Sequence, residues 1–289
     1  MDDFAVDSRM LAGSLSVKLR AVREAGFAQI MLCSHDLVNH PQGLDAAIDA
    51  VRSSELRVSG LLVLSDFEGL TGRMHAYKLE VAKSMLDLCA TLACRLLIVQ
   101  SSTLTRASSD TQSLVPSLRQ LAMLAIPKNI KIAYQSSIEG AVVKVFLQAW
   151  DVICEADMPN LGLCLDTYDM LVANPALADL LSDLEMLDPN KLFLVQLADQ
   201  LGGPESLIRV IAGEGDAREA LAALVCTLHT LGYRGNYCLA AFNADYAQLP
   251  PQPLVERARL SAQWLGQDVL LRSVPLPNQI RLRRVMAAQ

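Results

Sequence analysis

Short apolar runs alternate with amphipathic segments along almost the whole sequence, and this alternation limits the folds open to the chain. The runs with the length and composition of buried strands are 27–33, 58–64, 95–99, 131–134, 161–166, 191–196 and 236–239. The segments with helical periodicity are 13–26, 44–54, 74–92, 111–124, 142–156, 175–186, 218–231 and 253–265. With the weaker segment 4–11 as a first strand, the sequence predicts about eight strand–helix units.

A repeat of this kind is typical of parallel α/β proteins. About eight units is the number that closes a parallel (β/α)8 barrel, the TIM barrel. A doubly wound open sheet is the alternative, but no GxGxxG motif opens a helix after a strand. Nothing resembles a linker between domains, so we predict one barrel over residues 1–265 and a C-terminal tail over 266–289.

The composition narrows the classes of partner. Hydrophobic residues make up 52% of the 289 residues, which is enough for a sizeable core. The net charge of −6 disfavours nucleic acid as a partner. No apolar run reaches the roughly 18 residues of a membrane span, and the acidic start lacks the features of a secretory signal. The seven cysteines form no CxxC pair, so we expect reduced thiols and a cytoplasmic protein.

Polar residues stand at the ends of two predicted buried strands. Asp166 ends the run 161–166, and Gln196 ends the run 191–196. The carboxyl ends of the strands of a parallel barrel form the mouth in which active sites lie. We therefore expect Asp166 and Gln196 to belong to one site, with a buried carboxylate bonded to backbone amides as the alternative role for Asp166.

Several short motifs, in this order and spacing, resemble the xylose isomerase-like barrels of the sugar phosphate isomerase/epimerase superfamily. The resemblance covers about residues 11–265 and looks closest to the 3-dehydroshikimate dehydratases, which convert 3-dehydroshikimate to protocatechuate with a divalent metal. It implies isomerase or lyase (dehydratase) chemistry and a metal of the Mg, Mn or Co type. The motifs are Gly13-Ser14-Leu15, Ala25-Gly26-Phe27, Asp66-Phe67-Glu68-Gly69, Pro159-Asn160-Leu161-Gly162, Leu165-Asp166-Thr167-Tyr168, Gln196-Leu197-Ala198-Asp199, Gly213-Glu214-Gly215-Asp216, Gly232-Tyr233-Arg234-Gly235 and Phe242-Asn243.

The ligand set that this resemblance implies is incomplete. In that family a glutamate, an aspartate, a glutamine and a second glutamate hold the metal from four strand ends. Asp166 and Gln196 match the middle pair, whereas Gln135 stands at the first position and Ala240 at the last. Carboxylates favour a hard divalent cation because they offset its charge as well as coordinating it. The departures therefore predict a degraded metal site, in which Gln135 is a polar relic or a substrate contact rather than a strong ligand.

The residues that the family uses for proton transfer are also replaced. Val142 and Asp169 stand where the family carries histidines, and Met31 stands where a glutamate is common. Neither valine nor methionine can move a proton, so no catalytic residue is assigned.

Three further residues are candidate substrate contacts. Arg209 matches an arginine that contacts the acidic substrate in the family, and a bidentate guanidinium suits a carboxylate. A surface ion pair is the alternative for Arg209. Asp169 would repel a carboxylate ligand or donate a replacement metal oxygen. Glu68 could supply a displaced carboxylate.

Two functions are therefore predicted. One is a divergent enzyme that acts on, or binds, a small hydroxylated or carboxylated compound. The other is a catalytically inactive barrel that serves as a small-molecule binder or partner subunit. A homo-oligomer is compatible with either function. In the second, the apolar tail segments 269–271 and 274–280 are a candidate contact surface.

Overall fold

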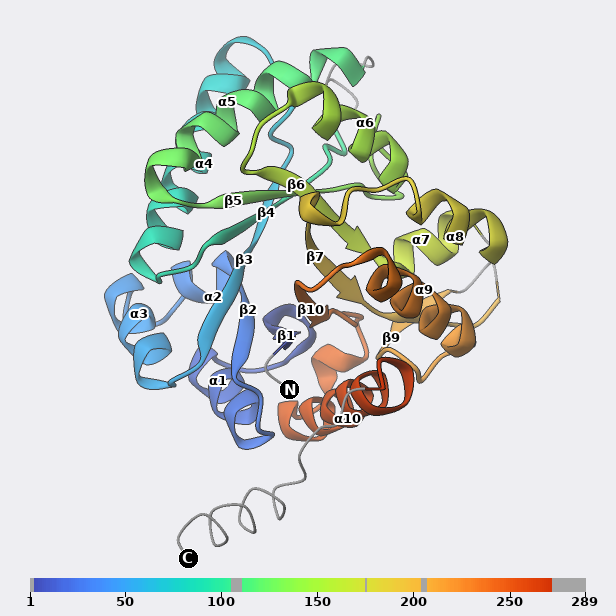
Figure 1. The fold of residues 1–289 in the computed structure, drawn as a ribbon. Coiled ribbons are helices and arrows are strands. Elements are labelled where there is room, and N and C mark those ends of the chain that lie inside the picture. The colour runs from blue at the N-terminus through green and yellow to red at the C-terminus, as the bar shows by residue number, and fades with distance from the viewer. Residues whose placement is uncertain (1–2, 105–110, 175, 204–206, 272–289) are drawn as a thin grey trace, which may run out of the picture.

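Eight parallel strands close into a barrel, and helices surround it (Figure 1). The computed structural model describes residues 3–104, 111–174, 176–203 and 207–271. The strands follow one another around the barrel in the order β1-β10-β7-β6-β5-β4-β3-β2. They are β1 (Phe4–Asp7), β2 (Gln29–Cys33), β3 (Arg57–Ser65), β4 (Leu96–Gln100), β5 (Lys131–Gln135), β6 (Leu161–Asp166), β7 (Leu192–Leu197) and β10 (Asn236–Leu239). The predicted TIM barrel is confirmed.

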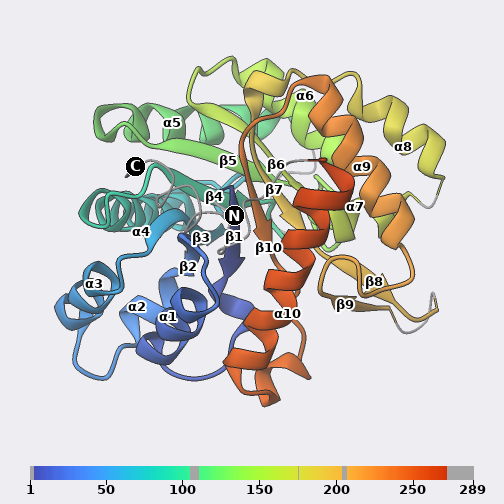
Figure 2. The same cartoon turned by 60° about the horizontal axis from the view of Figure 1, so that its bottom comes forward.

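The helices pack outside the barrel because each buries one apolar stripe against the outer face of the strands (Figures 1 and 2). The longer ones are α1 (Leu15–Glu24), α3 (Leu44–Ser53), α4 (Gly72–Thr91), α5 (Val115–Ala125), α6 (Phe146–Ala156), α8 (Leu177–Leu184), α9 (Arg218–Leu231) and α10 (Pro251–Trp264). Two short helices directly follow strands, α2 (Ser34–Val38) after β2 and α7 (Thr167–Ala173) after β6.

Several predicted boundaries were wrong. The helix predicted over 142–156 begins at Phe146, and the one predicted over 111–124 begins at Val115 after a short 3-10 turn. The segment 4–11 is a strand only as far as Asp7, whose side chain then accepts a hydrogen bond from Arg9 N and starts a 3-10 turn.

An antiparallel hairpin over the barrel end was not predicted. It consists of β8 (Asp199–Leu201) and β9 (Ile208–Val210), which pair with each other and lie outside the barrel sheet. Helix α10 continues into a π-helical turn over Leu265–Val269. The tail segment 274–280 and most of the predicted tail lie outside the described residues.

Two apolar layers hold the barrel together. The larger lies between the strands and the helices. The smaller fills the barrel interior and consists of Ala5, Met31, Leu62, Leu96, Ile98, Ala133, Cys164, Leu194, Cys238 and Ala240. Successive residues of a strand point to opposite faces, so the residue two positions beyond an interior residue also points inward. This alternation determines which side chains reach the mouth.

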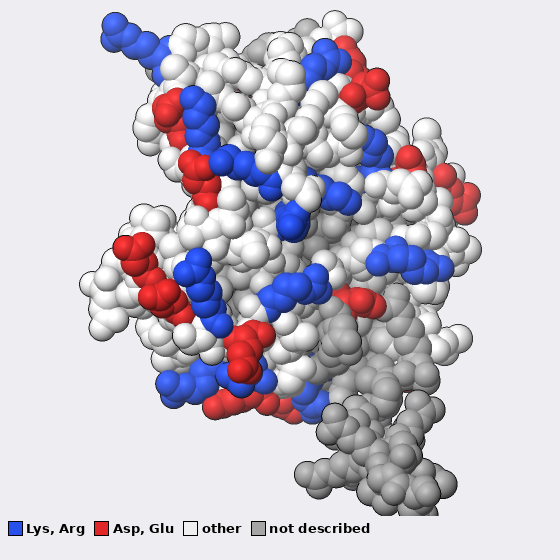
Figure 3. Space-filling model, turned by 60° about the vertical axis from the view of Figure 1, so that its left-hand side comes forward, with Lys and Arg blue, Asp and Glu red and all other residues white. Residues whose placement is uncertain are grey.

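The outer surface carries charges of both signs. On the face drawn in Figure 3, acidic and basic side chains lie beside one another over much of the surface. The exposed ion pairs of the protein include Arg23–Glu55, Lys83–Glu80 and Lys128–Asp87. Among the described residues, none of the helices combines the length and apolarity that a membrane-spanning segment needs.

Candidate functional site

Polar side chains from several strand ends point into the barrel mouth. Asp7, Gln135, Asp166 and Gln196 each lie two residues beyond a residue of the interior cluster, so the alternation of the strand turns all of them inward. Strands β5, β6 and β7 are consecutive in the barrel, the Gln135 amide donates to Asp166, and Asp166 pairs with Gln196 in the parallel register. The three predicted ligand positions that carry a polar side chain are therefore neighbours around one arc of the mouth.

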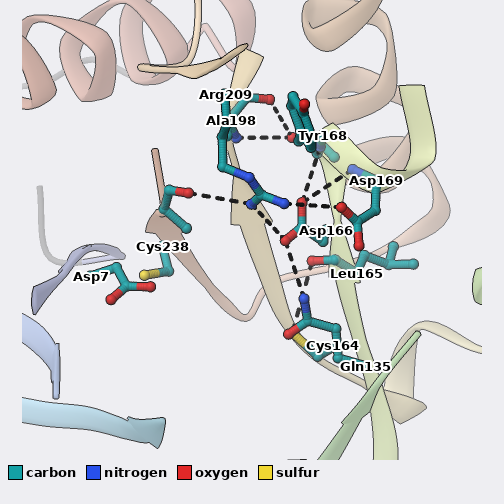
Figure 4. A network of polar contacts seen from close by, with 12 residues as sticks. Asp7, Gln135, Cys164, Leu165, Asp166, Tyr168, Asp169, Ala198, Arg209 and Cys238 are labelled. Carbon is teal, nitrogen blue, oxygen red and sulfur yellow. Dashed lines mark hydrogen bonds and ion pairs between the residues drawn. The ribbon is translucent and has the colours of Figure 1, made fainter. Parts of the chain in front are cut away.

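Asp166 is the centre of a hydrogen-bonded network (Figure 4). Its Oδ2 atom accepts from Gln135 Nε2 at 3.1 Å and from Arg209 Nη1 at 2.8 Å. Its Oδ1 atom accepts from the backbone N–H groups of Tyr168 and Asp169, which makes it the N-cap of α7. Both carboxylate oxygens are thus engaged, and the residue is only 4% exposed.

Arg209 reaches this network from strand β9. Its Nη2 atom donates to Asp169 Oδ1 at 3.0 Å, and its Nη1 atom donates to the Ala240 carbonyl oxygen at 3.3 Å as well as to Asp166. The guanidinium carbon lies 4.4 Å from the centre of the Tyr168 ring and 4.6 Å from that of Phe242. The side chain is 10% exposed, so the ion pair is buried and not the surface pair considered from the sequence.

Asp169 joins the network from the first turn of α7. Burial and the neighbouring charge of Asp166 raise the pKa of Asp169 to about 7, although Arg209 acts in the opposite direction. Asp169 also lines a pocket of about 220 Å³ between α6, α7 and α8. The other lining residues include Ser136, Lys144, Phe146 and Met170. The Asp169 carboxylate therefore borders a largely apolar pocket beside its ion pair with Arg209.

Gln196 is the predicted site residue whose polar atoms are least satisfied. Its side chain is fully buried, and neither its amide nitrogen nor its amide oxygen has a hydrogen-bond partner among the described residues. An unpaired buried amide costs on the order of 1–3 kcal/mol. Gln196 is thus available to donate to, and accept from, a bound molecule.

Glu68 does not join these residues. Its Oε1 atom accepts from the backbone N–H of Ser102 and, at 3.1 Å, from the hydroxyl of Tyr134. Tyr134 belongs to the outer apolar layer, one residue before the inward-facing Gln135. The Glu68 Oε2 atom is buried and has no hydrogen-bond partner among the described residues. Burial raises the pKa of Glu68 above its ordinary value.

The raised pKa of Glu68 predicts a dependence of stability on pH. The folded protein holds the Glu68 proton more tightly than the unfolded chain, whose glutamates titrate near pH 4.3. Stability should therefore fall as the pH rises from about 4.3 towards the folded-state pKa, by about 1.4 kcal/mol per unit of difference between the two values. Glu68→Gln should flatten this fall, measured as the urea unfolding free energy from pH 4 to 8. The exposed Glu139→Gln is the matched control, and parallel profiles for all three proteins would contradict the assignment.

A second ion pair lies in the mouth, and it was not predicted from the sequence. Arg9 binds Asp7 through Nε and Nη2, with the closest contact at 2.6 Å, and Asp7 is fully buried at the end of β1. The Arg9 guanidinium lies 4.3 Å from the centre of the Phe242 ring, which also contacts Arg209. The strand-end rule applied to the weak first strand would have identified Asp7.

The acidic groups of the site do not gather as metal ligands do. Among the described residues, there is no group of three or more His, Cys, Asp or Glu side chains placed to hold a metal ion. The strand-end position at Ala240 offers a methyl group and a backbone carbonyl, and that carbonyl already accepts from Arg209. What the site offers is a buried cation held between two carboxylates, beside two side-chain amides.

Comparison with known proteins gives one consistent relationship. A family model described as a xylose isomerase-like TIM barrel matches residues 19–267. The chain is 31% identical over 253 residues to a 3-dehydroshikimate dehydratase of Pseudomonas aeruginosa, covering 83% of this chain and 38% of the relative. It is 26% identical over 268 residues to the enzyme of that name from Pseudomonas putida, covering 91% of this chain and 41% of the relative. The chain thus spans about two fifths of the length of these two relatives.

A third relative and two solved structures agree with this relationship. An inosose isomerase of Halalkalibacterium halodurans is 27% identical over 153 residues, covering 51% of this chain and 52% of the relative. A fusion of a xylose isomerase-like TIM barrel with 4-hydroxyphenylpyruvate dioxygenase superimposes with a TM-score of 0.84 at 24% identity, covering 93% of this chain and 43% of the other. The IolI protein, solved with a bound zinc atom, superimposes with a TM-score of 0.80 at 19% identity, covering 92% and 99%.

Proposed function

We propose that this chain, which belongs to the xylose isomerase-like TIM barrel family, acts on or binds a small hydroxylated or carboxylated compound at its barrel mouth through a divergent site whose divalent-metal centre is degraded. The observation that carries the proposal is the network in which Gln135 and Arg209 both donate to the same oxygen of Asp166. The relationship to 3-dehydroshikimate dehydratases and inosose isomerases supports the class of compound.

The donor set does not fit a hard divalent cation. Among the four strand-end positions, Asp166 is the one carboxylate, and its Oδ2 atom already accepts two hydrogen bonds. Gln135 points its amide nitrogen, a donor, at that oxygen, and Ala240 has no side-chain donor atom. A cation with a charge of +2 would have one offsetting carboxylate and too few oxygens, so binding should be weak.

The same residues suit a neutral or acidic hydroxylated ligand. Gln196 has an unpaired donor and an unpaired acceptor, which a hydroxyl or carboxyl group could satisfy together. Arg9 and Arg209 lie against the Phe242 ring at the mouth, each already paired with a carboxylate there. Asp169, with a pKa near 7, can hold or release a proton close to neutral pH.

A catalytically inactive binder or partner subunit is the second candidate function. The observation that favours it is that Asp169, at a position where the family carries a histidine, is held by Arg209 at 3.0 Å. A side chain fixed in an ion pair is a poor proton shuttle, because moving the proton means breaking the pair.

Metal binding by the purified protein tests the proposal that the divalent-metal centre is degraded. Purified protein titrated with Mn²⁺ or Mg²⁺ and followed by calorimetry should show no stoichiometric binding up to millimolar concentration, and Asp166→Ala should behave in the same way. Stoichiometric metal that is lost in Asp166→Ala would contradict the proposal, because the ligand set would then have been rebuilt around Asp166.

A ligand titration separates the two candidate functions. 3-Dehydroshikimate serves as the probe, with thermal unfolding reporting binding and protocatechuate formation reporting turnover. A rise in Tm that Gln196→Leu abolishes, without turnover, would favour the binder. Metal-independent turnover would favour the enzyme. No effect of this probe or of related hydroxylated acids on Tm would count against the proposed class of compound.

A further inference from the structure

Arg209 joins two of the positions at which the family resemblance places metal ligands. Its Nη1 atom contacts Asp166 Oδ2 at the end of β6 and the carbonyl oxygen of Ala240 just beyond β10. Ala240 is the fourth ligand position and Asp166 the second. The guanidinium therefore lies between them.

The hydrogen bonds of Asp166 are those that a carboxylate makes to donors. Oδ2 accepts from Arg209 at 2.8 Å and from the Gln135 amide at 3.1 Å, while Oδ1 accepts from two backbone N–H groups of α7. A cation bound to Oδ2 would have to displace both the guanidinium and the Gln135 amide nitrogen. The first ligand position thus supplies a hydrogen-bond donor where a metal needs a lone pair.

The charges of the network also match a monovalent cation. Asp166 and Asp169 are held by one guanidinium, at 2.8 and 3.0 Å. The family ligand set offers three carboxylates to an ion with a charge of +2, and two of these are absent here. Asp169 adds one carboxylate, so two negative charges face one +1 guanidinium here, whereas three face a +2 ion in the family, and the net charge is −1 in both cases.

The position of Arg209 is built into the fold. Tyr168 and Phe242 stack against the guanidinium at 4.4 and 4.6 Å from the ring centres. The Asn243 side chain donates to the Arg209 backbone oxygen at 2.7 Å, and β9 pairs with β8. A flat cation in contact with two aromatic rings loses little further freedom in forming its ion pairs, so this geometry is pre-organised.

We propose that the Arg209 guanidinium is the resident cation of this barrel mouth and occupies the place that a divalent metal takes in the family. The inference rests on the proposed function, because it explains what replaces the degraded metal centre. It assigns Arg209 a positioning role: the arginine holds the Asp166 and Asp169 carboxylates in place and offsets part of their negative charge.

Removing the arginine tests the inference. In Arg209→Ala, the two carboxylates and the Ala240 carbonyl oxygen would face an emptied position. We expect a lower Tm than in the wild type and a new response to Mn²⁺. The Tm should rise by about 5 °C or more once the Mn²⁺ concentration is about 100-fold above its Kd. The wild type should gain less than about 1 °C under the same conditions.

Further variants keep the experiment decisive. Arg209→Gln keeps a planar polar group that can stack on the rings, and it replaces Arg209→Ala if that protein does not fold; it should show the same gain with Mn²⁺. Arg209→Lys retains the charge and should gain little. Asp166→Asn combined with Arg209→Gln should abolish the Mn²⁺ response, which ties the new metal site to Asp166.

The outcomes separate this inference from the proposed function. Stoichiometric Mn²⁺ binding by the wild type would overturn both, because the metal centre would be intact with Arg209 present. If neither the wild type nor either neutral Arg209 variant responds to Mn²⁺, the result still agrees with a degraded metal centre. The inference that Arg209 replaces the metal is then overturned. A response confined to the neutral variants supports both.

Discussion

Replacing Asp199 with alanine is expected to lower the free energy of unfolding by about 3–5 kcal/mol. Asp199 is fully buried at the start of β8, and its carboxylate accepts hydrogen bonds from four backbone N–H groups. The donors are Gln200 at 2.8 Å, Ala217 at 3.0 Å, and Gly213 and Gly215 at 3.1 Å. Alanine would leave these N–H groups without their acceptor, and each buried donor left unpaired costs on the order of 1–3 kcal/mol.

Equilibrium unfolding in urea measures this loss. Asp216→Ala is a matched control, because Asp216 is exposed in the same loop and accepts a hydrogen bond from Gly202 N at 3.0 Å. We expect that control to stay within about 0.5–1 kcal/mol of the wild type. Equal losses in the two variants would mean that the buried carboxylate does not organise the loop. Since this loop joins the hairpin that carries Arg209, the Asp199 variant should also lose the pre-organisation of the mouth.

The barrel could be predicted because each of its strands has a recognisable local sequence pattern. A strand buried on both faces is an uninterrupted apolar run, and the following helix shows a different periodicity, so the repeat is visible without tertiary information. The strand-end rule then placed Asp166 and Gln196 at the same mouth, where their parallel register confirms them as neighbours.

Helix α7 was missed because no turn signal precedes it. Asp166 ends strand β6 and also caps α7, since its Oδ1 atom accepts from Tyr168 N and Asp169 N. A single residue with both roles removes the loop that normally marks a boundary between strand and helix. This local geometry places Asp169 next to Asp166, so the carboxylate pair follows from a short connection that periodicity does not reveal.

The partner of that carboxylate pair depends on contacts distant in sequence. Arg209 lies 43 residues from Asp166 and 40 from Asp169, and it reaches them through a hairpin whose strands have three residues each. Strands this short give too little alternation to be recognised. The family resemblance identified Arg209 as a residue of the mouth, but its choice of partner became visible only in three dimensions.

Gly162→Ala is expected to lower the free energy of unfolding by about 2–3 kcal/mol, near the upper end for overpacking. Gly162 lies in β6, the strand that ends with Asp166, and pairs with Ala133 of β5. A Cβ atom at this position would lie 2.4 Å from the Lys191 carbonyl oxygen and 2.7 Å from the Phe193 ring. The ring can rotate away, but the carbonyl belongs to the backbone, so β6 and the approach to β7 would have to separate.

Two further variants make this prediction specific. Gly203→Ala is the control, because a Cβ atom there meets nothing within 4 Å, and we expect a change of less than about 0.5 kcal/mol. Gly162→Ala combined with Phe193→Leu should recover only part of the loss, since the shorter side chain relieves the ring contact and leaves the carbonyl contact in place. A neutral Gly162→Ala would mean that the strands tolerate a wider spacing. Full recovery in the double variant would place the strain on Phe193, which packs against the interior cluster.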